Sequence, residues 1–259
     1  MKLSGNTVLI TGGASGIGLA LARRLIEQGN TVVVCGRDQA RLDAARDALP
    51  ALTAIRSDVA DAASRQMLAD EMAAKFPGLN VLVNNAGLLH VSDLTEPGHV
   101  DELEAEVATN LIAPVALASL LLPLLRRQRA AAIVNVTTGY VFLPSARTAP
   151  YSATKSALHA MTRSLRFQLR STPVRVVEVM PPAVDTEMAS HYSGAKATPD
   201  FIAGRIIRGL RRDDDEIVIG LSRLARFLAR AAPETGFRLM NRAEEKASRR
   251  DPGSAPTTT

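Results

Sequence analysis

The chain has 259 residues, 46% of them hydrophobic and 22% charged, which suits one globular α/β domain with a sizeable core. The net charge is +5, but the chain has no Trp, few aromatic residues and no zinc-ligand pattern, so we expect neither nucleic-acid binding nor a metal site. Its only cysteine, Cys35, excludes an internal disulfide; we expect a buried thiol, which fits a reducing compartment.

Short apolar segments alternate with segments of helical length along most of the chain. The expected strands are 7–11, 31–35, 51–57, 79–84, 131–137, 174–180 and 216–220. The expected helices are 16–28, 38–48, 61–76, 98–127, 154–171 and 199–212. Most of the strands are nearly continuous apolar runs, which are typical of parallel strands covered on both faces. This alternation predicts a single α/β domain built on a doubly wound parallel sheet.

Three regions fall outside this alternation. Residues 186–200 are polar and rich in small residues, and they are suited to a substrate loop or an ordinary surface connection. Residues 221–248 form a C-terminal helical region, which Pro233 divides into two pieces. Leu, Phe and Arg recur there at helical spacing, so the stripe could cover the pocket, contact a partner subunit or lie on an anionic membrane; packing or a dimer contact is favoured. Residues 249–259 are expected to be a disordered tail.

Neither a membrane span nor a signal peptide is expected. The longest apolar stretch, 111–125, contains two prolines and is shorter than the roughly 20 residues that a bilayer requires. It is therefore expected to be a buried helix. The short apolar segment near the N-terminus runs directly into glycines, unlike a signal peptide. We expect a cytoplasmic protein.

A glycine-rich segment, TGGASGIG (11–18), follows the first expected strand and opens a helix. Glycines allow a tight turn and let the backbone approach a pyrophosphate, which then lies at the helix N-terminus. Because this segment has the strand–turn–helix context of a nucleotide-binding loop, it predicts a dinucleotide site rather than a plain structural turn.

Tyr151 and Lys155 form a second motif. Residues four apart on a helix share a face, so the phenol and the ammonium are expected to point into the same space. The positive charge favours the phenolate and is expected to lower the tyrosine pKa from about 10. Such a tyrosine can give a proton to a carbonyl oxygen or take one from an alcohol. This spacing is common by chance, but together with the glycine-rich loop it favours an oxidoreductase.

The segments TGGASGIG, NNAG (84–87) and YSATK (151–155), with Asn110, stand in the order and at the intervals of the short-chain dehydrogenase/reductase family, which the chain resembles over about residues 5–190. Its VCGR and PPAVDT segments are similar to those of the DltE-like bacterial oxidoreductases. The resemblance implies a Rossmann fold of about seven strands in the order 3-2-1-4-5-6-7. It also implies a homodimer or homotetramer formed through the helices expected at 98–127 and 154–171.

By the same resemblance, a nicotinamide dinucleotide lies at the carboxyl edge of the sheet. Asp58 would bind the adenine amino group, and its alternative is a turn or helix N-cap. Asn84 to Gly87 would line the adenine ribose and brace the central strand. The residues implied to contact the cofactor are Gly12, Ser15, Gly16, Ile17, Gly18, Arg37, Asp58, Val59, Asn85, Ala86, Gly87, Tyr151, Lys155, Pro181, Val184 and Thr186.

The choice of cofactor is expected to be made at the end of the second strand. NAD-selective relatives carry an acidic residue there, whereas a basic residue accommodates a 2′-phosphate. This chain has Gly36 and then Arg37, while Asp38 is expected to cap the next helix. A guanidinium binds phosphate through paired hydrogen bonds. We therefore expect NADP(H) in preference to NAD(H); the alternative is that Arg37 is a solvated surface charge.

The catalytic residues implied by the resemblance are Asn110, Thr138, Tyr151 and Lys155. Thr138 stands where the family has serine; its hydroxyl has the same hydrogen-bonding capacity, but its methyl narrows the rotamers, and Thr137 is the alternative. Asn110 would interrupt helix bonding and hold a water for Lys155, which would also bind the nicotinamide ribose. Pro182 replaces the usual glycine, so the loop that holds the nicotinamide must differ in shape.

These features predict an NADP(H)-dependent oxidoreductase that interconverts a carbonyl and an alcohol, with Tyr151 as the acid or base. We expect Tyr140 to wall the pocket and His159 to pack within a helix. The substrate is expected to be a hydrophobic small molecule because the stretch before the catalytic helix contains Val141, Phe142 and Leu143. Two alternatives are open: a regulatory dinucleotide-binding protein with weak catalysis, or a membrane-associated auxiliary enzyme of the cell envelope.

Overall fold

A seven-stranded parallel sheet forms the centre of the computed structural model, which describes residues 2–250. Its strands lie in the order β3-β2-β1-β4-β5-β6-β7, which confirms the doubly wound fold expected from the sequence. The order reverses between β1 and β4, and ligands of such sheets bind beside the carboxyl ends of strands at that point. The strands are β1 (Thr7–Thr11), β2 (Thr31–Gly36), β3 (Leu52–Arg56), β4 (Leu79–Asn84), β5 (Ala131–Val136), β6 (Val174–Met180) and β7 (Glu216–Val218).

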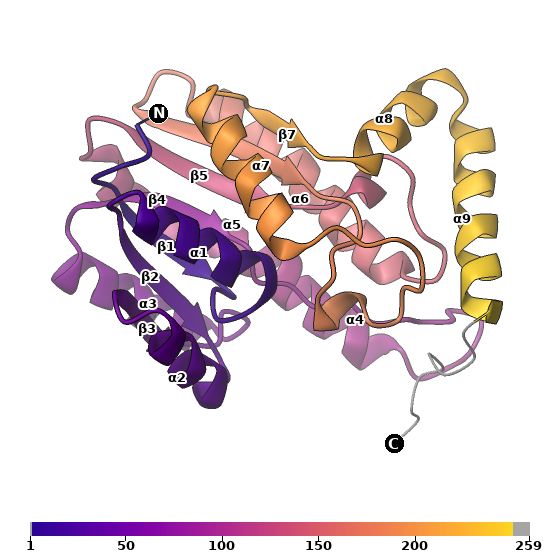
Figure 1. Ribbon diagram of the computed structural model, residues 1–259, viewed down its shortest axis with the longest axis horizontal. Helices are drawn as coiled ribbons and strands as arrows, with labels where there is room; N and C mark the ends of the chain where they lie inside the picture. Colours follow the sequence, from indigo (N-terminus) through magenta and orange to yellow (C-terminus); the bar gives the residue numbers. More distant parts are fainter. Residues whose placement is uncertain (1, 251–259) are drawn as a thin grey trace.

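Helices cover both faces of this sheet (Figure 1). One core cluster packs α1, α2 and α7 on one face, and a second packs α3 and α5 on the other. Successive side chains of β1 point to opposite faces of the sheet and so contribute to both clusters. Val8 and Ile10 belong to the first cluster and Leu9 to the second, and each is at most 1% exposed. The helices are α1 (Gly16–Glu27), α2 (Gln39–Ala48), α3 (Ala62–Lys75), α4 (Val100–Val107), α5 (Ala113–Arg126), α6 (Ala149–Gln168), α7 (Pro199–Arg211), α8 (Leu221–Ala231) and α9 (Pro233–Arg250).

The helix expected over 98–127 is composite. A π-helical turn, η1 (Ala108–Ile112), joins α4 to α5 and contains Asn110, where the sequence predicted an interruption of helix bonding. By length and hydropathy alone, Val100–Arg126 could cross a membrane. Its Leu117, Leu121 and Leu125 are buried in the core cluster on the sheet, as expected for a buried helix.

Two helix boundaries differ from the sequence prediction. The helix α6 begins at Ala149 rather than at residue 154, because Pro150 is well suited to the first helical turn. Tyr151 therefore lies at the helix N-terminus. The C-terminal region divides into α8 and α9 at Pro233, as predicted, but α9 continues to Arg250, so residues 249–250 are helical. The rest of the predicted tail lies outside the described residues.

Candidate active site

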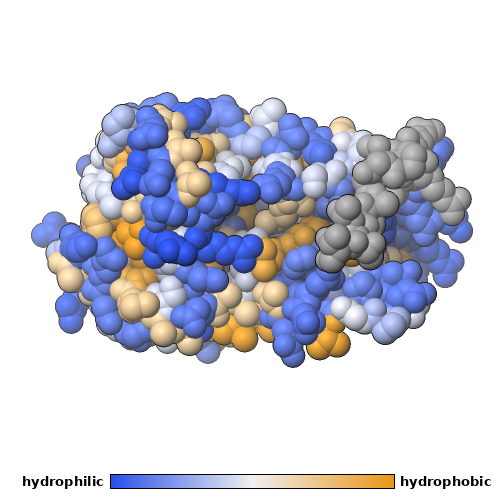
Figure 2. All heavy atoms as spheres, turned by 90° about the horizontal axis from the view of Figure 1, so that it is seen from below, coloured by the Kyte–Doolittle hydropathy of each residue, from blue (hydrophilic) through white to orange (hydrophobic). Residues whose placement is uncertain are grey.

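A cleft of about 1820 Å³ lies along the carboxyl edge of the sheet. Single ligand pockets occupy roughly 300–1,000 Å³, so this cleft has room for a dinucleotide and a second molecule. Seen from below, the molecule is hollowed near its middle and has hydrophobic side chains on the floor of the hollow (Figure 2). Of the residues predicted for the site, Gly18, Asn84 and Asn110 do not line the cleft, and the others do.

The glycine-rich turn between β1 and α1 forms one wall. Gly12 (φ +61°) and Gly16 (φ +52°) have left-handed backbone conformations that favour glycine. A Cβ at Gly16 would lie 3.0 Å from the side chain of Thr186, across the cleft. Gly18 packs behind the turn, where a Cβ would lie 2.5 Å from the carbonyl oxygen of Gly12. Gly18 therefore lets the helix approach the turn, and its predicted contact with the cofactor stays a prediction.

The end of β4 holds this turn in place. The Thr11 hydroxyl accepts hydrogen bonds from the backbone N–H groups of Asn85 and Ala86, both at 3.0 Å. The Asn85 amide donates to the carbonyls of Thr11 and Gly12. The side chain of Asn85 thus braces the glycine-rich turn while the segment itself lines the cleft. Asn84 bonds Asn135 of β5 at 2.8 Å and braces the central strands, as expected.

At the end of the cleft where the sequence predicts adenosine binding, Asp58 follows β3 and lines the cleft. Its carboxylate accepts from the N–H of Ala60 at 2.9 Å, so it also stabilises a turn, while Asp61 is the cap of α3. Arg65, which the sequence did not single out, is buried and donates to the carbonyls of Val59 and Ala60 at 2.7 and 2.8 Å. It fixes the backbone of this wall.

Two guanidinium groups lie on the cleft beyond β2. Arg37 is exposed, and Asp38 caps α2 by accepting from the N–H of Arg41, as predicted. Arg41 also pairs with Asp38 at 3.2 Å and with Glu187 at 2.8 Å. Glu187 begins η3 (Glu187–Ala189) in the predicted substrate loop, so this ion pair crosses the cleft. Sequence reasoning missed Arg41 because its position on a polar helix looks like any solvated charge.

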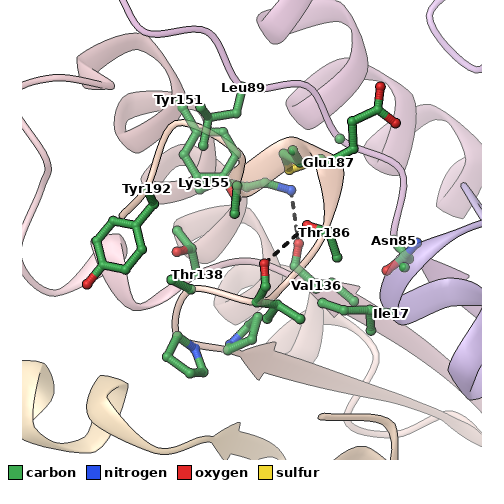
Figure 3. Close-up of a pocket in the computed structure, with 18 of the residues that line it drawn as sticks. Ile17, Asn85, Leu89, Val136, Thr138, Tyr151, Lys155, Thr186, Glu187 and Tyr192 are labelled. Atoms are coloured by element: carbon green, nitrogen blue, oxygen red, sulfur yellow. Dashed lines mark hydrogen bonds between the residues drawn. The ribbon is translucent and has the colours of Figure 1, made fainter. Parts of the chain in front are cut away.

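The catalytic end lies at the N-terminal part of α6, where Tyr151 and Lys155 share one face (Figure 3). They are 7% and 4% exposed. The Lys155 ammonium donates to the carbonyl of Val136 at 3.0 Å and lies 5.7 Å from the centre of the Tyr151 ring. Thr138, two residues after β5, points toward the same space. We call these three side chains, which the sequence predicts to be catalytic, the catalytic cluster.

Burial dominates the electrostatics of this cluster. Desolvation raises the pKa of Tyr151 above its ordinary value, although a hydrogen bond with Thr138 lowers it in part. Desolvation also lowers the pKa of Lys155 to about 8. The lowered tyrosine pKa expected from the sequence is therefore wrong, because the loss of water around the phenol is the largest effect on its pKa and the negative charge of Glu106 raises it further. At neutral pH, Tyr151 is a neutral phenol that can donate a proton.

Thr137, the alternative to Thr138, faces the other way. Its hydroxyl donates to the buried carboxylate of Glu178 at 2.7 Å. His159 bonds the same carboxylate at 2.9 Å, which supports the expectation that it is a packing residue. Both threonines line the cleft, but the hydroxyl of Thr138 is the one that is hydrogen-bonded to Tyr151.

Asn110 lies behind the catalytic cluster. Its amide N–H₂ donates to the Leu88 carbonyl at 2.9 Å and to the Thr154 hydroxyl at 3.1 Å, and its oxygen accepts from the Leu88 N–H at 2.8 Å. A Cβ at Gly87 would lie 3.2 Å from the Asn110 oxygen and 3.5 Å from the Lys155 nitrogen. Asn110 therefore holds the wall segment at Leu88 against α6, close to Lys155.

A polar contact joins α9 to the loop after Thr138 at the end of the cleft where substrate is expected to bind. The Tyr140 hydroxyl donates to one oxygen of Glu244 at 2.7 Å, and the Ser145 hydroxyl donates to the other at 2.6 Å. The Tyr140 ring meets Tyr151 edge-on, with centres 6.4 Å apart. Tyr140 lines the cleft as predicted, but Glu244, from α9, was not found because nothing local marks it as buried.

The loop after β6 completes the cleft with Pro181, Pro182 and Val184. The Pro181 carbonyl accepts from the N–H of Gly139, which ties this loop to the residue after Thr138. Cys35 is buried as expected, and burial raises the pKa of its thiol to about 12. Within the described part of the chain, no group of three or more His, Cys, Asp or Glu side chains is placed to hold a metal ion.

Residues 6–197 match the short chain dehydrogenase family. The chain is 50% identical over 189 residues to the uncharacterized oxidoreductase DltE of Bacillus subtilis, a match that covers 72% of this chain and 74% of that protein. It is 31% identical to L-fucose dehydrogenase of Bos taurus over 268 residues, a match that covers 99% of this chain and 97% of that protein.

Solved structures share the fold. A short chain dehydrogenase from Burkholderia cenocepacia in complex with NADP has a TM-score of 0.82 at 24% identity and covers 91% of this chain and 97% of its own. One from Burkholderia phymatum in complex with NAD has a TM-score of 0.81 at 23% identity, covering 90% and 95%. Because the family match spans about three quarters of its length and the relatives above agree, this chain belongs to the short-chain dehydrogenase/reductase family of oxidoreductases.

Proposed function

We propose that this protein is an NADP(H)-dependent cytoplasmic oxidoreductase that interconverts a carbonyl and an alcohol. The observation that carries the proposal is the buried cluster of Tyr151, Lys155 and Thr138 at one end of a cleft whose other end is formed by a glycine-rich turn. A proton donor thus lies on the same cleft as a site suited to a dinucleotide.

The residues present fit such a cofactor. Gly12 and Gly16 leave the turn without side chains at the N-terminus of α1, where a pyrophosphate is stabilised. The guanidinium groups of Arg37 and Arg41 are suited to a 2′-phosphate, which favours NADP(H) over NAD(H). Thr186 and Pro181 would adjoin the nicotinamide, and Lys155 would bind its ribose.

The chain's own residues supply the proton chemistry, and the nicotinamide, when bound, supplies or accepts the hydride. Thr138 would donate a hydrogen bond to the substrate oxygen and fix its position. Tyr151, a neutral phenol at neutral pH, would give its proton to that oxygen as a carbonyl is reduced. Lys155 would stabilise the resulting phenolate, because it is largely cationic below its pKa of about 8.

The substrate proposed for this cleft is hydrophobic. Leu88, Leu89, Val91 and Leu143 line it near the catalytic cluster. A polyhydroxylated sugar such as L-fucose, for which the bovine relative is named, would leave this apolar surface without a partner.

The decisive test is Tyr151→Phe, assayed through NADPH absorbance against a panel of aldehydes and ketones that includes L-fucose. Loss of the proton donor should lower kcat by roughly a hundredfold to ten-thousandfold, while NADPH binding by calorimetry changes little. Tyr192→Phe, which also removes a phenolic hydroxyl from the cleft, is the matched control and should lose far less.

Turnover by Tyr151→Phe at the wild-type rate would contradict the proposal. Binding of NADPH by the wild-type protein without oxidation across the whole panel would instead favour a regulatory dinucleotide-binding protein.

A further inference from the structure

The two C-terminal helices place unusually exposed leucines on the wall of the cleft. Leu221 and Leu224 of α8 are 62% and 53% exposed, and Leu239 of α9 is 60% exposed. All three line the cleft. Leucines this exposed that converge on one hollow indicate a surface that an apolar partner covers.

Both helices present the same pattern to the cleft. Each contributes residues at positions i, i+3, i+4 and i+7, which form one face of a helix. We call these residues the leucine face: Leu221, Leu224, Ala225 and Leu228 on α8, and Gly236, Leu239, Met240 and Ala243 on α9.

The two halves of the leucine face meet. A Cβ at Gly236 would lie 3.1 Å from the Cβ of Leu228 and 3.2 Å from the side chain of Leu143. A Cβ at these distances would be tightly packed, so glycine favours the close approach of α9 to both side chains. The apolar surface is therefore continuous from α9 through α8 to Leu143, which lies three residues after Tyr140.

The leucine face is also continuous with the catalytic cluster. Ser222, at the start of α8, packs on Gly139, where a Cβ would lie 2.5 Å from the serine hydroxyl. Gly139 directly follows Thr138. Tyr140 bridges the other side, since its ring contacts Tyr151 and its hydroxyl is bonded to Glu244. A molecule on the leucine face would therefore reach the catalytic hydroxyls past Ser222 and Tyr140, and the one carboxylate beside this path, Glu244, is bonded to the hydroxyls of Tyr140 and Ser145.

The charged side chains of α8 are turned away from the cleft. Arg223 donates to the carbonyl of Val218 at 2.9 Å, and Arg226 pairs with Glu216 at 3.1 Å. Both partners belong to β7. The apolar side of α8 therefore faces the cleft, and neither of these two arginines lines it.

We propose that the leucine face binds the apolar chain of a long-chain aliphatic carbonyl or alcohol substrate, whose oxygen lies between Thr138 and Tyr151. This inference rests on the proposed oxidoreductase function and specifies its substrate class. Short or polyhydroxylated substrates leave the face exposed, whereas a long alkyl chain covers it and gains the hydrophobic free energy of burial.

The test is a chain-length series of straight-chain aldehydes from butanal to dodecanal, with NADPH as the reductant. For the wild-type protein, kcat/KM should rise by up to about fourfold for each added methylene that the face buries, which corresponds to about 0.8 kcal/mol. The double variant Leu224→Asn, Leu239→Asn should lower the dodecanal-to-butanal ratio of kcat/KM by at least about tenfold.

Phe227→Asn is the matched control, because Phe227 is on the same helix and 65% exposed but does not line the cleft. It should keep the wild-type ratio. Sedimentation and vesicle binding are measured in parallel. If the double variant keeps the ratio but changes the molecular mass or the binding to anionic vesicles, the face covers another copy or a membrane and the proposal is wrong.

A second measurement separates this inference from the proposed function. Dodecanol and butanol are titrated into the NADPH-loaded protein by calorimetry, which requires no turnover. Reduction of butanal without any preference for longer chains overturns the inference alone. Tighter dodecanol binding that depends on Leu224 and Leu239, in a protein that reduces no aldehyde, supports the leucine face and refutes the oxidoreductase proposal.

Discussion

At the scale of single residues, Tyr151 and Lys155 show what spacing can and cannot predict. Their separation of four residues places both on one face of α6, as the sequence indicated. The direction of the tyrosine pKa shift depends instead on burial, which comes from elements far away in the chain. With both groups less than 10% exposed, desolvation raises one pKa and lowers the other.

The choice of cofactor is also decided by individual side chains. Arg37 is exposed at the cleft and was identified from its position after β2, whereas Arg41 becomes a candidate only when α2 is placed beside the same cleft. We predict that Arg37→Asp weakens NADPH binding by about tenfold to a hundredfold, the loss expected for hydrogen bonds to a charged group. NADH binding should change little or improve.

Both dissociation constants are measured by calorimetry. Arg46→Asp is the control, since Arg46 is an exposed arginine on the neighbouring helix α2 but does not line the cleft. An unchanged ratio of NADPH to NADH affinity in Arg37→Asp would show that Arg37 is a solvated surface charge.

At the scale of elements, the ends and irregularities of helices position the site. The π-helical turn η1 carries Asn110, and its two-sided contact with Leu88 holds the segment after β4 against α6. The family resemblance carried by the neighbouring motifs predicted that Asn110 interrupts the helix bonding here. The start of α6 at Ala149 was missed, because a proline is compatible both with a loop and with a first helical turn.

The contact between α9 and the catalytic loop is a testable feature at this scale. Glu244 is 8% exposed and accepts from the hydroxyls of Tyr140 and Ser145. Glu244→Ala leaves both hydroxyls without this acceptor, so the free energy of unfolding should fall by about 1–3 kcal/mol. Hydrogen exchange of α9 should become faster as the helix loosens from the loop.

Denaturant unfolding measures the first effect. Glu245→Ala is the control, because the carboxylate of Glu245, the next residue, is exposed. Removing it should change the free energy of unfolding by less than about 0.5 kcal/mol. Equal stability losses in the two variants would show that the buried contact does not hold α9.

At the scale of the whole molecule, apolar side chains remain exposed on the helices that the resemblance implicated in self-association. Ile112, Met161 and Phe167 are 48%, 45% and 67% exposed on η1 and α6, and η1 packs against α6. We predict a dimer or tetramer formed through this surface, because burying such side chains is favourable.

Sedimentation velocity over a range of concentrations measures the mass. Phe167→Asp should shift the protein toward the monomer. Phe201→Asp, on α7 at the other face of the sheet and 50% exposed, should keep the wild-type mass. A monomeric wild-type protein would refute the prediction.

The sequence by itself determined the α/β alternation and the glycine-rich turn, because hydrophobic periodicity and turn residues are local properties of the chain, and the family resemblance of its motifs implied the strand order and most of the cleft residues. The tertiary structure decided the pKa directions, the partner of the Thr137 hydroxyl, and the positions of Gly18, Arg41, Arg65 and Glu244. Each of these depends on which distant side chains become neighbours and how much water they displace, and a local pattern carries neither kind of information.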